Sequence, residues 1–159
     1  DVVGIESAVA LKNGYALGIA LTIGLNQREY GIDSPLHFNS QAAVFAQSVK
    51  EMYRLLEFQG AAGIDNLAVG AGDLYVTVYG GRTRRVGILL GRGMDIDEAK
   101  RELNGVTLES LVVAVRVARV VRLCAAEGRL DLADFPLLIH VDDILTNKVP
   151  ADIPWDDFT

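Results

Sequence analysis

The chain has 159 residues, half of them hydrophobic but only 7% aromatic, with 15 basic and 21 acidic side chains and a net charge of −6. A chain of this length can bury one substantial core, so the composition excludes a disordered tail and a disulfide-stapled mini-protein. The acidic balance argues against a nucleic-acid or membrane-surface partner. One cysteine and two histidines argue against a structural zinc site and give no sign of an oxidising compartment, so we expect a cytoplasmic protein.

The N-terminal part of the chain predicts two long helices. We expect an extended segment at residues 1–5, then a helix over about residues 6–25 that is buried on all sides, because its sequence is apolar or small almost throughout. A polar loop follows, and a second helix is expected over about residues 40–59. Its predicted apolar face consists of Ala43, Phe45, Val49, Met52, Leu55 and Leu56.

The rest of the chain is also predicted to be mainly helical. Residues 61–93 are rich in glycine and suggest short helices joined by tight turns, although residues 74–79 weakly indicate a strand. A short helix ending near residue 103, a long helix over about residues 108–127 and a last helix over about residues 135–145 follow.

The predicted fold class is therefore all-α. We expect residues 1–5 to be the end of a connection between domains and residues 6–147 to form one helical domain. Residues 148–159, which are acidic and broken by prolines, are expected to form an irregular tail.

Lys12 and Asn13 lie inside an otherwise apolar or small stretch, AVALKNGYALGIAL. A lysine in such surroundings is costly unless it is paired or faces a cavity. Its ammonium could donate to a carbonyl or alkoxide oxygen, which suits acid–base chemistry. A lysine that extends its ammonium to water from a helix end is the simpler interpretation, but the adjacent Asn13 favours an internal polar site.

Asp73 and Thr77 lie four residues apart in GAGDLYVTVYGG, so one helical turn would place them on the same face. Asp73 could orient a lysine, and Thr77 could bond a substrate oxygen. Asp73 could equally be the cap of a helix that follows Gly72.

The segment YGGRTRRVGILLGRG is typical of an anion site. Its glycines, including Gly81, permit a tight turn, and Arg82 and Thr83 would then lie in the first turn of a helix whose N–H groups attract an anion. A solvated cluster of surface arginines is the alternative. A nucleic-acid patch is disfavoured because aromatic residues are not interleaved with the arginines.

In order and spacing, these segments resemble the C-terminal domain of NAD(P)-dependent glycerol-3-phosphate dehydrogenase. The resemblance covers about residues 1–144 and rests on five blocks. These are the initial DVVGIE, the ALKN helix (10–13), N-x-x-A-A (39–43), GAGDL with Thr77 (70–77) and GGRTRRVGILLGRG (80–93). The implied architecture is the multi-helix domain of the 6-phosphogluconate-dehydrogenase-like type, without the N-terminal Rossmann domain.

The resemblance also implies roles for individual residues. Lys12 would be the catalytic proton donor and acceptor at the substrate C2 oxygen, oriented by Asp73. Asn13 and Thr77 would line the substrate site. Residues 81–83 (Gly81, Arg82 and Thr83) would bind the substrate phosphate. Arg82 would also contact the dinucleotide, as would Thr107 and Glu109, whereas the residues alone suggest only that Glu109 starts a helix.

Three positions depart from the family pattern. Thr83 replaces the asparagine of R-N-R, Gln41 replaces the lysine of N-T-K-A-A, and Ser110 follows Glu109 where the family has glycine. A hydroxyl at residue 83 can still donate to a phosphate, but it lacks the second donor of an amide. These differences leave open a paralogue with an altered substrate.

The resemblance further implies NAD or NADP as cofactor, no metal, a small phosphorylated substrate, and a Rossmann domain of the same protein as partner. The chain lacks a G-x-G-x-x-G unit of its own, so it is expected to be inactive alone. A homodimer is also compatible with the apolar helices. Two alternatives remain: a related dehydrogenase domain for another hydroxy acid, and a non-catalytic helical dimerisation module.

Overall fold

The computed structural model describes residues 1–103 and 109–158, with the side chains of residues 109 and 110 left out. All seven long elements of the described chain are α-helices, as the sequence predicts, and no strand occurs in these residues. The helices are α1 (Val2–Tyr30), α2 (Phe38–Phe58), α3 (Ile64–Val78), α4 (Gly81–Gly91), α5 (Ile96–Glu102), α6 (Glu109–Ala126) and α7 (Pro136–Asn147). Two short 3₁₀ helices are η1 (Leu132–Asp134) and η2 (Trp155–Asp157).

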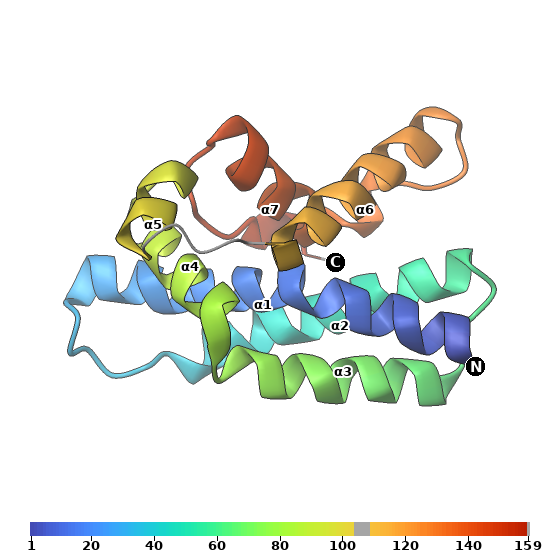
Figure 1. Cartoon of the computed structure of the whole chain (residues 1–159), viewed down its shortest axis with the longest axis horizontal. Helices are drawn as coiled ribbons and strands as arrows, with labels where there is room; N and C mark the ends of the chain where they lie inside the picture. The colour runs from blue at the N-terminus through green and yellow to red at the C-terminus, as the bar shows by residue number, and fades with distance from the viewer. Residues whose placement is uncertain (104–108, 159) are drawn as a thin grey trace.

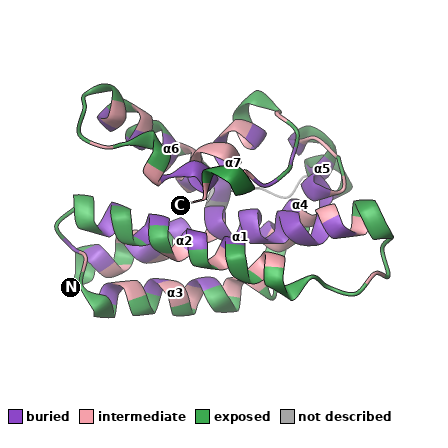
Figure 2. Ribbon diagram, turned by 180° about the vertical axis from the view of Figure 1, so that it is seen from behind, coloured by how far each residue is buried: buried purple, intermediate pink, exposed green. Residues whose placement is uncertain are grey.

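Helix α1 is the central element of the fold. It runs along the long axis beside α2 and α3, while α5, α6 and α7 lie on one side of this layer (Figure 1). It contacts α2, α3, α4, α6 and α7, and its residues from Gly14 to Gly24 are all buried (Figure 2). Because these residues are apolar or small on every face, the helix can be surrounded by other helices.

Close approaches between small residues fix how α3 and α4 lie against α1. A Cβ added at Gly70 of α3 would stand 2.7 Å from the Ala8 Cβ, and one at Gly87 of α4 would stand 2.6 Å from the Ala20 Cβ. Further along, a Cβ at Gly24 would stand 2.8 Å from the Gly91 Cα. Residues further along α1 thus contact residues further along α3 and then α4. Both helices therefore run parallel to α1.

Several expected boundaries were wrong. Residues 2–5 are helical rather than extended, because the Asp1 side chain accepts a hydrogen bond from the Gly4 backbone N–H and caps α1. Helix α1 also continues past residue 25 to Tyr30. The strand indicated at residues 74–79 is also wrong, since these residues form the last turns of α3 and its C-cap.

Glu51 of α2 is a buried carboxylate that the sequence analysis did not single out. Its two oxygens accept hydrogen bonds from the backbone N–H groups of Leu137 (2.8 Å) and Leu138 (2.9 Å) in the first turn of α7, and Gln47 donates a third (3.0 Å). Burial raises the pKa of Glu51 to about 7, although these hydrogen bonds lower it. A side chain of α2 therefore caps α7. Ala43, expected on the buried face of α2, is exposed.

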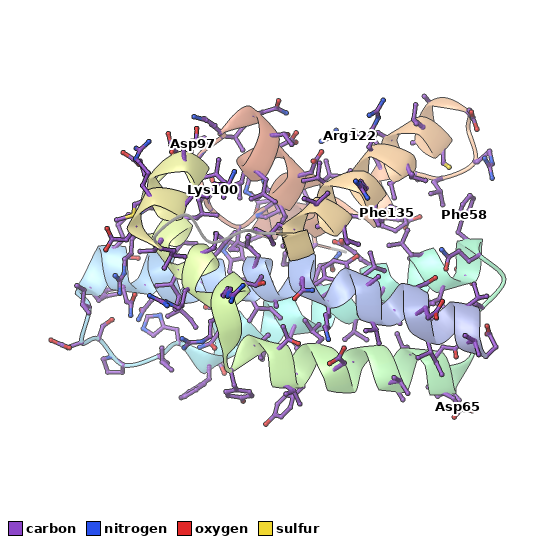
Figure 3. The ribbon with its side chains drawn as sticks, in the orientation of Figure 1. Phe58, Asp65, Asp97, Lys100, Arg122 and Phe135 are labelled. Carbon is purple, nitrogen blue, oxygen red and sulfur yellow. The ribbon has the colours of Figure 1, made fainter. Side chains whose placement is uncertain are left out.

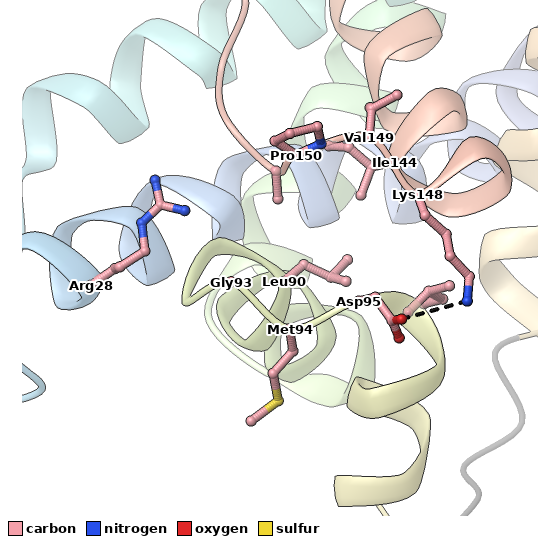
Figure 4. Close-up of a pocket in the computed structure, with 11 residues that line it drawn as sticks. Arg28, Leu90, Gly93, Met94, Asp95, Ile144, Lys148, Val149 and Pro150 are labelled. Carbon is pink, nitrogen blue, oxygen red and sulfur yellow. Dashed lines mark hydrogen bonds and ion pairs between the residues drawn. The ribbon is translucent and has the colours of Figure 1, made fainter.

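Ion pairs join the C-terminal helices. Arg122 of α6 (labelled in Figure 3) pairs with Asp142 and Asp143 of α7, at 3.4 and 2.8 Å. Lys148, which ends α7 in a left-handed conformation, pairs with Asp95 and Asp97 at the start of α5, at 3.5 and 2.6 Å. Between α7 and the start of α5, a cavity of about 270 Å³ is lined by Lys148 and Asp95 (Figure 4).

Helix α1 is the one described helix that is long and apolar enough to cross a membrane by length and composition. Of its most apolar 18-residue window, 72% is buried inside the protein, which is typical of a core helix. After α7 the described chain is largely irregular, and Ala151 and Ile153 are buried against the core.

Candidate functional site

Lys12 and Asp73 meet between α1 and α3. The Lys12 Nζ donates a hydrogen bond to the Asp73 Oδ2 at 2.5 Å, and the two side chains are 25% and 31% exposed. Both residues lie in the middle of their helices, so Asp73 is not a helix cap and Lys12 is not at a helix end. The close approach of Ala8 and Gly70, about one turn earlier, brings the two helices near enough for this pair to form.

Two further predicted site residues, Thr77 and Asn13, lie close to this pair in the sequence. Thr77, one turn beyond Asp73, donates its hydroxyl to the Asp73 backbone oxygen at 2.7 Å. The Thr77 oxygen can therefore still accept a hydrogen bond but has already used its donor. Asn13, next to Lys12 in the chain, is half-buried, and its side-chain amide can both donate and accept hydrogen bonds.

The turn from α3 to α4 has the conformation that the sequence predicts. Gly80 is extended and Gly81 has a φ of +84°, a value that favours glycine. Helix α4 begins at Gly81, which places Arg82 and Thr83 in its first turn. The Arg82 side chain is exposed and pairs with none of the described carboxylates, whereas Thr83 is only 5% exposed. Arg82 therefore presents a cation where a helix attracts anions.

The parallel packing places this turn along α1 just beyond the Lys12–Asp73 pair. Residue 12 of α1 meets residue 73 of α3, and residue 20 meets residue 87 of α4. Residues 79–83 thus lie beside the part of α1 that follows Lys12, where α4 leaves the end of α3 (Figure 1). The Lys12–Asp73 pair and the start of α4 therefore follow one another along α1.

Some predicted site residues cannot be placed. Thr107 lies outside the described residues, as does the side chain of Glu109, although Glu109 begins α6. Among the described residues, no group of three or more His, Cys, Asp or Glu side chains could hold a metal ion.

Comparison with known proteins shows the family of the chain. The model of the family "NAD-dependent glycerol-3-phosphate dehydrogenase C-terminus" matches residues 1–155. The chain belongs to this family. The match covers all seven α-helices and all of the predicted site residues.

Two members of this family from different organisms share about a third of their residues with the chain over the aligned regions. The chain is 37% identical over 108 residues to the NADP(+)-dependent glycerol-3-phosphate dehydrogenase of Archaeoglobus fulgidus, covering 65% of this chain and 30% of the relative. It is 30% identical over 152 residues to glycerol-3-phosphate dehydrogenase [NAD(P)+] of Polynucleobacter asymbioticus, covering 94% and 40%. The chain thus spans less than half the length of these relatives.

A solved structure shares the fold. The glycerol-3-phosphate dehydrogenase of Saccharomyces cerevisiae superposes with a TM-score of 0.75 at 29% identity, over 95% of this chain and 40% of that one. The all-helical domain described above is therefore the C-terminal domain architecture of this dehydrogenase family.

Proposed function

We propose that this chain is the substrate-binding and catalytic half of an NAD(P)-dependent glycerol-3-phosphate dehydrogenase, which interconverts sn-glycerol 3-phosphate and dihydroxyacetone phosphate. The contact between Lys12 and Asp73, in a chain of this family, is the observation that supports the proposal most strongly. It supplies a partly exposed amine held by a carboxylate, which suits proton transfer at a substrate oxygen.

In this proposal Lys12 is the general acid and base. An ammonium has three donors, and the pair with Asp73 uses one of them, so two remain for a ligand. When the ketone is reduced, Lys12 gives a proton to the C2 oxygen. When the alcohol is oxidised, the neutral amine takes that proton from the hydroxyl. Asp73 orients the amine throughout, and Asn13 and Thr77 bind substrate hydroxyl groups beside it.

The phosphate of the substrate would bind at the start of α4. Arg82 supplies a guanidinium, which can form two parallel hydrogen bonds to the oxygens of one phosphate. Backbone N–H groups of the first turn, from Gly81 to Thr83, and the positive end of the helix dipole add to the attraction. Since Thr83 is buried, we expect its backbone rather than its hydroxyl to contribute most.

The nicotinamide cofactor, when bound, supplies or accepts the hydride at C2. Of the three side chains predicted to contact it, the exposed Arg82 fits an anionic dinucleotide by its charge. Thr107 and Glu109 are proposed as further contacts. We propose that an N-terminal Rossmann domain provides most of the cofactor site, so the 159-residue chain alone should not turn over substrate.

Substitution of Arg82 tests the phosphate site. In the enzyme that includes the Rossmann domain, Arg82→Ala should raise the KM for sn-glycerol 3-phosphate by about 10- to 100-fold, as expected for loss of a charged hydrogen bond. Its effect on the slow oxidation of unphosphorylated glycerol should be small. The matched control is Arg85→Ala, an exposed arginine one turn further along α4. Equal losses with both substrates would contradict the assignment and favour a dehydrogenase for another hydroxy acid.

A further inference from the structure

Asn66 is a buried polar side chain of α3 that joins three segments of the chain. It is 3% exposed, and its Oδ1 accepts a hydrogen bond from the Asp1 backbone nitrogen at 3.0 Å. Its Nδ2 donates to the Asp1 Oδ2 and to the Ala61 carbonyl oxygen, both at 2.9 Å. One amide thus holds together the start of α1, the connection from α2 to α3 and the first turn of α3, which lie at the same end of the molecule (Figure 1).

Asn66 lies on the face of α3 that packs against α1. Three residues of this face meet residues of α1 at four-residue intervals: Asn66 meets Gly4, Gly70 meets Ala8, and Asp73 meets Lys12. A Cβ at Gly4 would stand 2.7 Å from the Asn66 Cγ, so the amide reaches its position because α1 has a glycine there. Asn66 and Asp73 are therefore two turns apart along one line of contact between the helices.

The contacts along this line differ in how firmly they fix the position of α3 along α1. The middle contact joins Gly70 with Ala8, and apolar contacts of this kind are non-directional. The Lys12–Asp73 pair is partly exposed, so it contributes little to stability. The hydrogen bonds of Asn66 are directional and shielded from water, and breaking them is more costly. Asn66 is therefore the strongest directional restraint among these contacts.

We propose that Asn66 is a positioning residue for the Lys12–Asp73 pair. It fixes α3 against the start of α1 and so keeps the Asp73 carboxylate within hydrogen-bonding distance of the Lys12 ammonium. The inference rests on the proposed function, because this positioning matters for turnover only if Lys12 takes part in the reaction. If a Rossmann domain precedes Asp1, the peptide N–H of Asp1 can make the same hydrogen bond to Asn66.

Asn26 provides a matched control for this proposal. It is also a buried asparagine, at 5% exposure, and its Nδ2 donates to the Ser34 Oγ and the Pro35 carbonyl oxygen, both at 2.9 Å. It lies in α1, 14 residues beyond Lys12, or about 20 Å along the helix axis. Asn66→Ala and Asn26→Ala should therefore lower the midpoint of thermal unfolding to a similar extent, but only Asn66→Ala should affect the pair.

Kinetics of both variants, in the enzyme that includes the Rossmann domain, test the proposal. Asn66→Ala should lower kcat by about 10- to 100-fold, because a small displacement of a reacting group is enough for such a loss. The KM for sn-glycerol 3-phosphate should change by less than about twofold, since α4 has its own close contacts with α1. Asn26→Ala should leave kcat unchanged within about twofold. Equal effects of the two substitutions on kcat would overturn the inference.

Two further measurements separate positioning from stability and from the proposed function. In an Asp73→Ala background, Asn66→Ala should lower kcat no further, and multiplicative losses would overturn the inference. If Asn66→Ala does not fold, Asp1→Ala, at an exposed position, breaks the same contact from the other side and should lower kcat, whereas an unchanged kcat would overturn the inference. An unchanged kcat in Lys12→Ala would refute the proposed function itself, while a loss there without a loss in Asn66→Ala refutes only this inference.

Discussion

Two charged clusters lie among the apolar helices, and they differ in how fully their hydrogen-bonding groups are used. Glu51 is completely buried, and three donors from α2 and α7 surround its carboxylate. Lys12 and Asp73 are a quarter to a third exposed and bond mainly to each other. The first cluster is closed and joins two helices, whereas the second retains donors and acceptors toward solvent. A candidate chemical site therefore differs from a structural one in that its polar groups are partly exposed and can still form hydrogen bonds with a ligand.

The largest effect is expected from Lys12→Ala. In the enzyme with its Rossmann domain, loss of the proton donor should lower kcat by about 10²- to 10⁴-fold. The free energy of unfolding should fall by at most about 1 kcal/mol, because the ion pair is partly exposed. Steady-state kinetics and denaturant unfolding would measure the two quantities, with Lys50→Ala, an exposed lysine on α2, as the control. Unchanged turnover would contradict the role of Lys12 as proton donor and would favour a helical domain that takes no part in the chemical step.

Lys12→Ala is expected to affect turnover more than stability, whereas Glu51 should affect stability, in a way that depends on pH. Its folded pKa of about 7 lies above the unfolded value of 4.5, so its contribution to stability is fully present below 4.5 and is lost as the pH rises through 7. Between pH 5.5 and 8, the unfolding free energy of the wild type should fall by about 2 kcal/mol relative to Glu51→Gln. Denaturant unfolding of both proteins measures this difference, and a difference independent of pH would contradict the assignment.

A change in the packing of α4 on α1 should affect both the free energy of unfolding and binding at the proposed phosphate site. A Cβ at Gly87 would stand 2.7 Å from the Leu17 backbone oxygen, so α4, which carries Arg82 at its start, must shift. Gly87→Ala should cost about 1–3 kcal/mol of stability and raise the KM for the phosphorylated substrate.

Gly72→Ala is the matched control for this substitution. Gly72 lies inside α3, and an added Cβ there meets nothing within 4 Å. This change should therefore stabilise the protein by about 0.5–1 kcal/mol, as expected for alanine in a helix. If Gly87→Ala behaved in the same way, α1 and α4 would not be in close contact.

The sequence predicted which segments are helical better than it predicted where each helix begins and ends. Apolar periodicity and stop signals located α1, α2, α5, α6 and α7, whereas residues 61–93 were predicted only as short helices and contain the 15-residue α3. The turn at Gly81 and the first turn of α4 were predicted correctly. The start of α1 was missed because a single Asp1 cap makes residues 2–5 helical. The strand indicated near residues 74–79 reflects local β-branched and aromatic residues, whose preference is overridden by packing of α3 on α1.

The candidate site could be predicted only in part. The position of Lys12 in an apolar stretch and the motif around Asp73 pointed to polar groups, but only the parallel packing of α1 and α3 shows that they touch. Glu51 could have been found from its spacing, because Val44, Ser48, Glu51 and Leu55 recur on one helical face. Its role as a cap depends on α7, more than 80 residues away in the chain, and no local pattern contains that contact.

A double-mutant cycle on Lys12 and Asp73 tests the central claim most directly, with kcat of the enzyme measured for Lys12→Ala, Asp73→Ala and the double variant. If Asp73 acts by orienting Lys12, then Asp73→Ala alone lowers kcat, and adding it to Lys12→Ala lowers kcat no further. Independent, multiplicative losses would show that the two residues do not act together and would contradict the account.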